Sequence, residues 1–255
     1  MTSALRALQA VDFNWTHALH DVWSDPPFHV EELHKPTIDR IMEEFRSRTL
    51  QPNANPIGHV ISGRAGVGKT HMIGTLRRRV WEAQGWFVLL DIVGITDFWA
   101  TAAHGFIESL SRRITGGVPQ YKAVLSRILA GMRGDEAARR VIGGWLAKPA
   151  RTKLDTVEAY LELLRNVDSA GARKHQDIVR ALILMDSDDN ETSNLAYSWL
   201  QGADVDEVKR RELKFLAPPP HPSELVRGML WLMSLAGPTL IAVDQIDSIV
   251  SEANT

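Results

Sequence analysis

The 255-residue chain is 44% hydrophobic and 24% charged, which is typical of one or two globular domains, and its formal net charge of −2 excludes a strong overall attraction to nucleic acid. It contains no cysteine, which excludes a disulfide framework, a thiol nucleophile and a cysteine-based zinc site. No apolar run is long enough to cross a membrane, and the N-terminus lacks the basic-then-apolar layout of a signal peptide, so the cytoplasm is the expected location.

Residues 1–50 are predicted to be mostly helical. Apolar spacing over 30–45 indicates a helix with one apolar face, and Pro26 and Pro27 separate it from an earlier, loosely periodic stretch. Four histidines lie close together in this region: His17, His20, His29 and His34. No carboxylate accompanies them in a metal-binding pattern, so solvated or packed histidines are favoured over a metal site. A turn-rich linker follows at 51–56.

The next stretch fits G-x-x-x-x-G-K-[ST], the phosphate-binding loop or Walker A motif. Its residues are Gly63, Arg64, Ala65, Gly66, Val67, Gly68, Lys69 and Thr70. The apolar run 57–62 before it is predicted to be a buried strand, and the residues after it keep helical spacing. Glycines let successive N–H groups converge on phosphate oxygens. We expect Lys69 to reach the β- and γ-phosphates and the Thr70 hydroxyl to bind Mg²⁺.

A second apolar run, 86–92, is predicted to be a buried strand parallel to the first through the intervening helix. Asp97 then precedes a predicted helix from about 100 to 114 and is suited to cap it. For Asp91 and Asp97, capping or loop roles are favoured over a polar contact near a nucleotide. Residues 115–221 repeat helical patterns without a convincing pair of strands, which indicates an all-helical insertion.

The stretch 239–247 has the form of a Walker B strand, with an apolar run that ends in Asp244. Asp244 would lie at the carboxyl end of a buried parallel strand, where it could hold Mg²⁺. Many hydrolytic P-loop enzymes carry Glu at the next position, whereas this chain has Gln245, whose amide can orient water but cannot take its proton. The nearest acid is Asp247. Hydrolysis is therefore expected to be slow, or to use Asp247 or another subunit as its base.

These elements predict an α/β chain with a P-loop NTPase parallel sheet, incomplete at the C-terminus, and a large all-helical insertion. The predicted domains are an N-terminal helical region, 1–50, a P-loop core, 51–114 with 222–255, and the insertion, 115–221. Residues 152–155 resemble a guanine-specificity tetrapeptide, but they precede the Walker B stretch instead of following it. ATP is therefore favoured over GTP.

The phosphate loop, the strand 86–92 and residues 243–247 together resemble the AAA+ ATPases, especially the branch shared by origin-recognition-type and STAND ATPases. Residues 199–202, followed by Arg211 and Leu213, faintly resemble ATP-binding proteins of bacterial phage-defence systems such as BREX. The resemblance implies a list of ligand-binding residues: Gly63, Gly66, Gly68, Lys69 and Thr70 for phosphate and Mg²⁺, and Asp244 for Mg²⁺.

The AAA+ resemblance also implies a strand order. Another strand would lie between the phosphate-loop strand and the Walker B strand, so 57–62 and 240–244 are expected to share a sheet without pairing directly. Such ATPases continue past Walker B with a sensor strand, an arginine finger and a helical lid. Because this chain ends soon after Asp247, it is expected to be the N-terminal piece of a longer protein.

The function favoured by these patterns is a Mg²⁺-dependent ATP-binding module that couples nucleotide state to conformational change in a larger assembly, with homo- or hetero-oligomeric partners. The alternative is a nucleotide-binding switch or scaffold with little hydrolysis, which Gln245 favours. A P-loop kinase ranks third, since no site for a phosphate acceptor stands out. Nucleic acid stays open as a partner, through a local basic patch.

Overall fold

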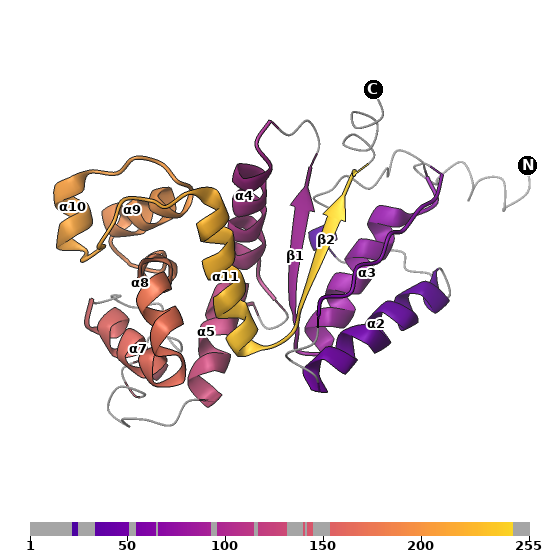
Figure 1. Cartoon of the computed structure of the whole chain (residues 1–255), viewed down its shortest axis with the longest axis horizontal. Helices are drawn as coiled ribbons and strands as arrows, with labels where there is room; N and C mark the ends of the chain where they lie inside the picture. The colour runs from indigo at the N-terminus through magenta and orange to yellow at the C-terminus, as the bar shows by residue number, and fades with distance from the viewer. Residues whose placement is uncertain are drawn as a thin grey trace, which may run out of the picture. The chain divides into compact units, whose positions relative to one another are not determined.

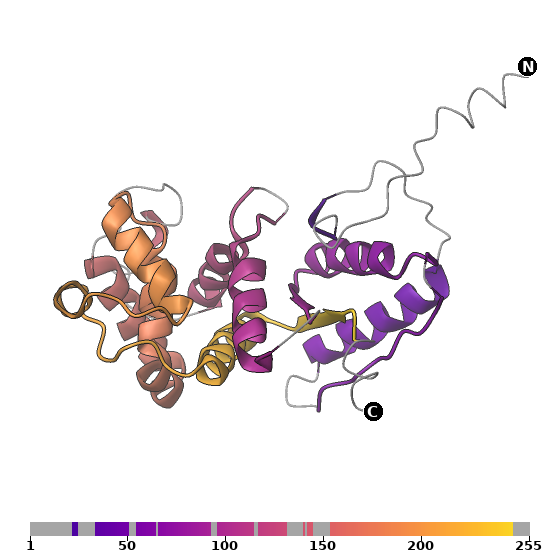
Figure 2. The same cartoon turned by 90° about the horizontal axis from the view of Figure 1, so that it is seen from above.

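The computed structural model describes residues 22–24, 34–50, 55–64, 66–92, 96–114, 117–131, 140, 142–144 and 154–246. The chain forms two compact units, Met1–Ala83 and Gln84–Thr255. The described residues are mostly helical and contain one parallel sheet of two strands, so the chain is of the mixed α/β class (Figures 1 and 2). None of the described helices has both the length and the apolar character that a membrane span requires.

Among its described residues, the first unit has two α-helices, α2 (Lys35–Leu50) and α3 (Lys69–Glu82). Both were expected from apolar spacing, and both carry a buried apolar stripe. The stripe residues are Ile38, Ile41, Met42 and Phe45 on α2, and Met72, Ile73, Leu76 and Val80 on α3. Because the two helices contact each other, these stripes hold α2 against the helix that follows the phosphate loop.

The prediction of a buried strand at 57–62 is wrong. The segment is irregular and mostly exposed, with Val60 92% and Ile57 45% exposed. A strand exists only where its backbone pairs with a neighbour, and the sheet of the described residues contains no strand from this segment. The predicted parallel pairing of 57–62 with the second strand is therefore wrong too, as is its place in a common sheet with 240–244.

The sheet belongs to the second unit, where β1 (Trp86–Asp91) pairs in parallel with β2 (Thr239–Asp244). β1 is buried, as predicted. β2 is the predicted Walker B strand, but the expectation that it is buried is wrong, because Ile241 and Val243 are 41% and 42% exposed. The reason is that a strand buries both faces only where other elements cover both, and α4 packs along β1.

Side chains close the other edge of β1. The Gln120 amide mimics a peptide group: its Oε1 accepts the Phe87 N–H at 3.0 Å, and its Nε2 donates to the Phe87 carbonyl at 2.9 Å. The Ser109 hydroxyl accepts the Leu89 N–H at 3.0 Å. Gly105 lets the backbones approach here, since an added Cβ would lie 2.9 Å from the Leu89 carbonyl oxygen. Both backbone groups of Phe87 and the N–H of Leu89 are thus satisfied on this side without a further strand.

The remaining helices of the second unit form two groups. Beside the sheet lie α4 (Phe98–Ser111), α5 (Gln120–Gly131) and α11 (Pro222–Ala236). On their far side from the sheet lie α7 (Leu154–Val167), α8 (Ser169–Leu184), α9 (Asn190–Leu200) and α10 (Glu207–Glu212) (Figure 1). Helical patterns had predicted these elements, and Asp97 caps α4 as expected. Helical spacing also predicts a helix at 136–146, a range that lies mostly outside the described residues.

Candidate functional site

The phosphate loop turns on two glycines in a left-handed conformation. Gly66 has a φ of +82° and Gly68, which precedes the first residue of α3, has a φ of +89°. Any other residue type would be strained at these positions. Between them, the Val67 N–H donates to the Arg64 carbonyl at 3.4 Å and closes a turn. Two glycines of the motif therefore occupy positions that call for glycine, while Ala65 lies outside the described residues.

Lys69 begins α3 and lies back along the loop. Its ammonium donates to the carbonyls of Gly63 at 2.8 Å and Arg64 at 3.3 Å. Thr70 is the second residue of the helix. Because α3 begins directly after Gly68, its first N–H groups and the positive end of its dipole lie at the loop. Gly68 has no side chain that could cap these N–H groups. This combination of a cation, backbone donors and a hydroxyl suits a polyphosphate.

Asp244 lies at the carboxyl end of β2, as predicted, and is buried. Its Oδ1 accepts the N–H of Gln245 at 2.9 Å. The sheet register places Asp91, the last residue of β1, directly beside Asp244. Paired residues of parallel strands point to the same face, so two carboxylates lie together at the edge where open α/β sheets bind ligands. The sequence signal for this pair is that both apolar strands end in Asp.

Gln245 directly follows β2 and has a φ of +61°, in the left-handed region that few residues other than glycine adopt. Such a conformation is costly, and it is found more often at functional sites than elsewhere. The chain thus leaves the extended conformation directly after Asp244. Asp247, the other candidate base, lies outside the described residues.

The candidate Mg²⁺ ligands come from both units. Thr70 belongs to the first unit, whereas Asp244 and its neighbour Asp91 belong to the second. Across the described ranges, His, Cys, Asp and Glu side chains form no group of three that could hold a metal ion. Joint binding of one Mg²⁺ by Thr70 and Asp244 therefore stays a prediction.

One residue at the loop was missed in the sequence. The Nε2 of His34 lies 2.7 Å from the carbonyl oxygen of Val67, although the two residues are 33 positions apart. From the sequence, His34 is predicted to be solvated or packed, like His17, His20 and His29. No local pattern could have singled it out, because the contact depends on how α2 packs within the first unit.

Comparisons with known proteins add no relative to these observations. No family model, no curated protein and no solved structure matches the chain. The resemblance to AAA+ ATPases therefore rests on the sequence motifs themselves.

Proposed function

We propose that this chain is the Mg²⁺-dependent ATP-binding module of an AAA+-like ATPase, with a P-loop core, which couples nucleotide state to conformational change in a larger assembly. The observation that carries the proposal is the loop itself. Gly66 and Gly68 have left-handed backbones, Lys69 lies along the loop, and α3 begins directly after it. Together they offer converging N–H donors and a positive charge to a triphosphate.

Each residue has a role in this proposal. Lys69 would exchange its contacts with the carbonyls of Gly63 and Arg64 for contacts with phosphate oxygens, since an ammonium carries three donors. The hydroxyl of Thr70 and the carboxylate of Asp244 would hold Mg²⁺, a hard cation that prefers oxygen ligands. When bound, Mg²⁺ supplies charge that offsets the negative charge of the phosphates.

Helix α11 offers a route for coupling. It contacts α4, α5 and α8, and it is followed, after Gly237 and Pro238, by β2. A shift of Asp244 at the far end of β2 would therefore be passed along β2 to α11. Through its contact with α8, α11 would pass the shift on to the helices α7–α10. Packed elements of this kind transmit motion as rigid bodies.

The second candidate is a nucleotide-binding switch or scaffold with little hydrolysis. The observation that favours it is Gln245, which stands directly after Asp244 with a left-handed backbone. An amide can orient a water molecule, but general-base catalysis needs a group that accepts its proton.

Replacing Lys69 by alanine is expected to weaken the binding of a fluorescent ATP analogue at least about tenfold, or about 1.4 kcal/mol. The reason is that the variant loses the ammonium that would face the phosphates. The measurement is a fluorescence titration with Mg²⁺ present. Lys209→Ala, an exposed lysine on α10, is the matched control and should bind as the unmodified chain does. Equal affinity in a folded Lys69→Ala variant would contradict the phosphate assignment.

The isolated chain is expected to hydrolyse ATP at well under about 1 s⁻¹, the low end of ordinary enzymes. Gln245→Glu is expected to raise this rate by about 10²-fold, the lower range for a general base. Phosphate release, measured in steady state, checks both expectations. The double variant Lys69→Ala with Gln245→Glu controls for a contaminating ATPase and should show no gain. Turnover above about 1 s⁻¹ in the unmodified chain would favour the first candidate over the second.

A further inference from the structure

Helix α2 contacts the segment that carries the phosphate loop at two points. At its start, the Nε2 of His34 lies 2.7 Å from the Val67 carbonyl oxygen. Further along the helix, the carboxylate of Glu44 lies 2.8 Å from the Nε2 of His59. The helix therefore runs antiparallel to the segment from His59 to Val67 and spans it over about 15 Å, by the rise of an α-helix.

His34 is held firmly at the first of these points. Its carbonyl accepts the N–H groups of Thr37 and Ile38, each at 3.0 Å, and so begins α2. Its φ of +60° lies in the left-handed region, which a histidine adopts at a cost. The buried stripe of α2 packs on α3, whose first turn adjoins the loop. The imidazole is therefore placed relative to the loop by packing within one unit.

The hydrogen bond from His34 to the Val67 carbonyl also sets the direction of the N–H in the same peptide group. Because a carbonyl oxygen only accepts, Nε2 of His34 carries the hydrogen in this contact. The peptide bond between Val67 and Gly68 is planar and trans, so its C=O and N–H point in opposite directions. A donor that holds the Val67 oxygen on the α2 side therefore turns the Gly68 N–H to the opposite side. That N–H belongs to the run of donors expected to face phosphate.

The segment before the phosphate loop explains why side chains of α2 are needed to hold the loop in place. Residues 57–62 form no strand in the structure, so no sheet fixes the approach to the loop through a backbone ladder. The contact between His59 and Glu44 fixes this approach instead. Helix α2 thus takes over, with side chains, a role that strand pairing would otherwise fill.

We propose that His34 is a positioning residue of the phosphate loop, which orients the Gly68 N–H toward phosphate by holding the Val67 carbonyl. The inference rests on the proposed ATP site. It implies that His34 contributes to binding only when the ligand carries the phosphate that the Gly68 N–H faces, and contributes nothing to the binding of adenosine. It also implies that a neutral donor at the same reach can replace the imidazole.

The test compares His34→Ala and His34→Gln with the unmodified chain. A glutamine amide reaches about as far as Nε2 and donates in the same way, whereas alanine donates nothing. His34→Ala is expected to weaken MgATP binding about five- to tenfold, the effect of one hydrogen bond to an oriented group, and to leave adenosine binding unchanged. His34→Gln is expected to bind MgATP within about threefold of the unmodified chain. Displacement of a fluorescent ATP analogue by MgATP, MgADP and adenosine gives the affinities, and thermal unfolding without nucleotide checks the fold.

The outcomes separate the two proposals. If the unmodified chain binds MgATP and Lys69→Ala does not, but His34→Ala binds normally, the role of His34 is overturned and the ATP site stands. If His34→Ala and His34→Gln weaken MgATP binding equally, His34 acts through packing and the inference is overturned. If the unmodified chain does not bind MgATP, the ATP site fails, and the inference with it. Should His34→Ala fail to fold, His34→Gly, which relieves the left-handed strain while removing the donor, takes its place.

Discussion

Replacing Gln120 by leucine is expected to lower the free energy of unfolding of the second unit by about 3–5 kcal/mol, because a buried backbone group that loses its partner costs about 1–3 kcal/mol. Gln120 is fully buried and bonds both backbone groups of Phe87. Its Nε2 also donates to the Ser109 carbonyl at 3.0 Å. Leucine fills a similar volume, so the loss would come from the hydrogen bonds and not from a cavity.

Urea unfolding followed by circular dichroism measures this loss as a lower midpoint at constant slope. Gln176→Leu is the matched control, because Gln176 is on the surface of α8 and its amide donates to the Arg173 carbonyl in an exposed position. That substitution should change the unfolding free energy by less than about 0.5 kcal/mol. A loss below about 1 kcal/mol in Gln120→Leu would mean that water or a shifted helix satisfies Phe87, and that the amide is not what closes the edge.

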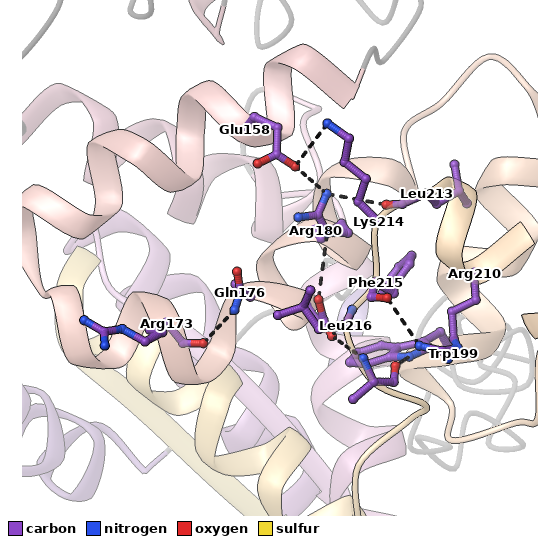
Figure 3. Close-up of polar contacts among 12 residues, drawn as sticks. Glu158, Arg173, Gln176, Arg180, Trp199, Arg210, Leu213, Lys214, Phe215 and Leu216 are labelled. Carbon is purple, nitrogen blue, oxygen red and sulfur yellow. Dashed lines mark hydrogen bonds and ion pairs between the residues drawn. The ribbon is translucent and has the colours of Figure 1, made fainter.

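Replacing Arg180 by leucine is expected to cost about 3–5 kcal/mol, the range for breaking a buried ion pair from one side. The Arg180 side chain is 3% exposed. Its Nη1 donates to Glu158 at 2.9 Å and to the Leu213 carbonyl at 3.4 Å, as Figure 3 shows. Its Nε lies 3.8 Å from Asp177. The carboxylate of Asp177 in turn accepts the N–H groups of Leu216 and Ala217.

The pH dependence of this variant identifies the cause. Burial raises the pKa of Asp177 above its ordinary value, despite the two N–H donors and Arg180. A carboxyl whose pKa is raised in the fold costs stability when ionised, and that cost disappears as the pH falls through the folded pKa. Without Arg180, the ionised carboxylate of Asp177 lowers the free energy of unfolding further. As the pH is lowered from neutral, Arg180→Leu should therefore regain part of the stability that it lost relative to the unmodified chain.

Urea unfolding at neutral and mildly acidic pH measures this recovery. The double variant Arg180→Leu with Asp177→Asn should lose less stability than Arg180→Leu alone and should show no recovery in acid. Arg173→Leu, at an exposed arginine on the same helix, is the matched control for loss of a positive charge. If the double variant were as unstable as Arg180→Leu, the loss would come from Glu158 and Leu213 instead of Asp177.

Local patterns were sufficient for most helices and for two strands. The apolar spacing of 154–167 by itself predicts a helix over this range, and α7 has the same bounds, because this periodicity is a property of the segment itself. The left-handed glycines of the phosphate loop and the cap at Asp97 depend only on residues nearby in the sequence, so they could be predicted in the same way.

The errors and omissions all involve partners distant in sequence. The apolar run 57–62 reads as a strand, but a strand depends on a neighbour that the run does not encode. The contact of His34 with Val67 crosses 33 positions, and so does that of Gln120 with Phe87. A lone histidine and a lone glutamine carry no periodic signal, so neither contact could be predicted.

The amide of Gln120 affects the edge at which a further strand could join the sheet. Gln120 occupies the N–H and C=O of Phe87, and Ser109 occupies the N–H of Leu89, so a strand from this chain or from another cannot pair with these groups without displacing both side chains. An additional strand would therefore join more readily beside β2, the strand that ends in Asp244. Edge-to-edge association, the usual hazard of an open sheet, is thereby favoured on the side of β2, which bears the candidate catalytic residues. A strand that extends the sheet on this side would also come to lie next to Asp244.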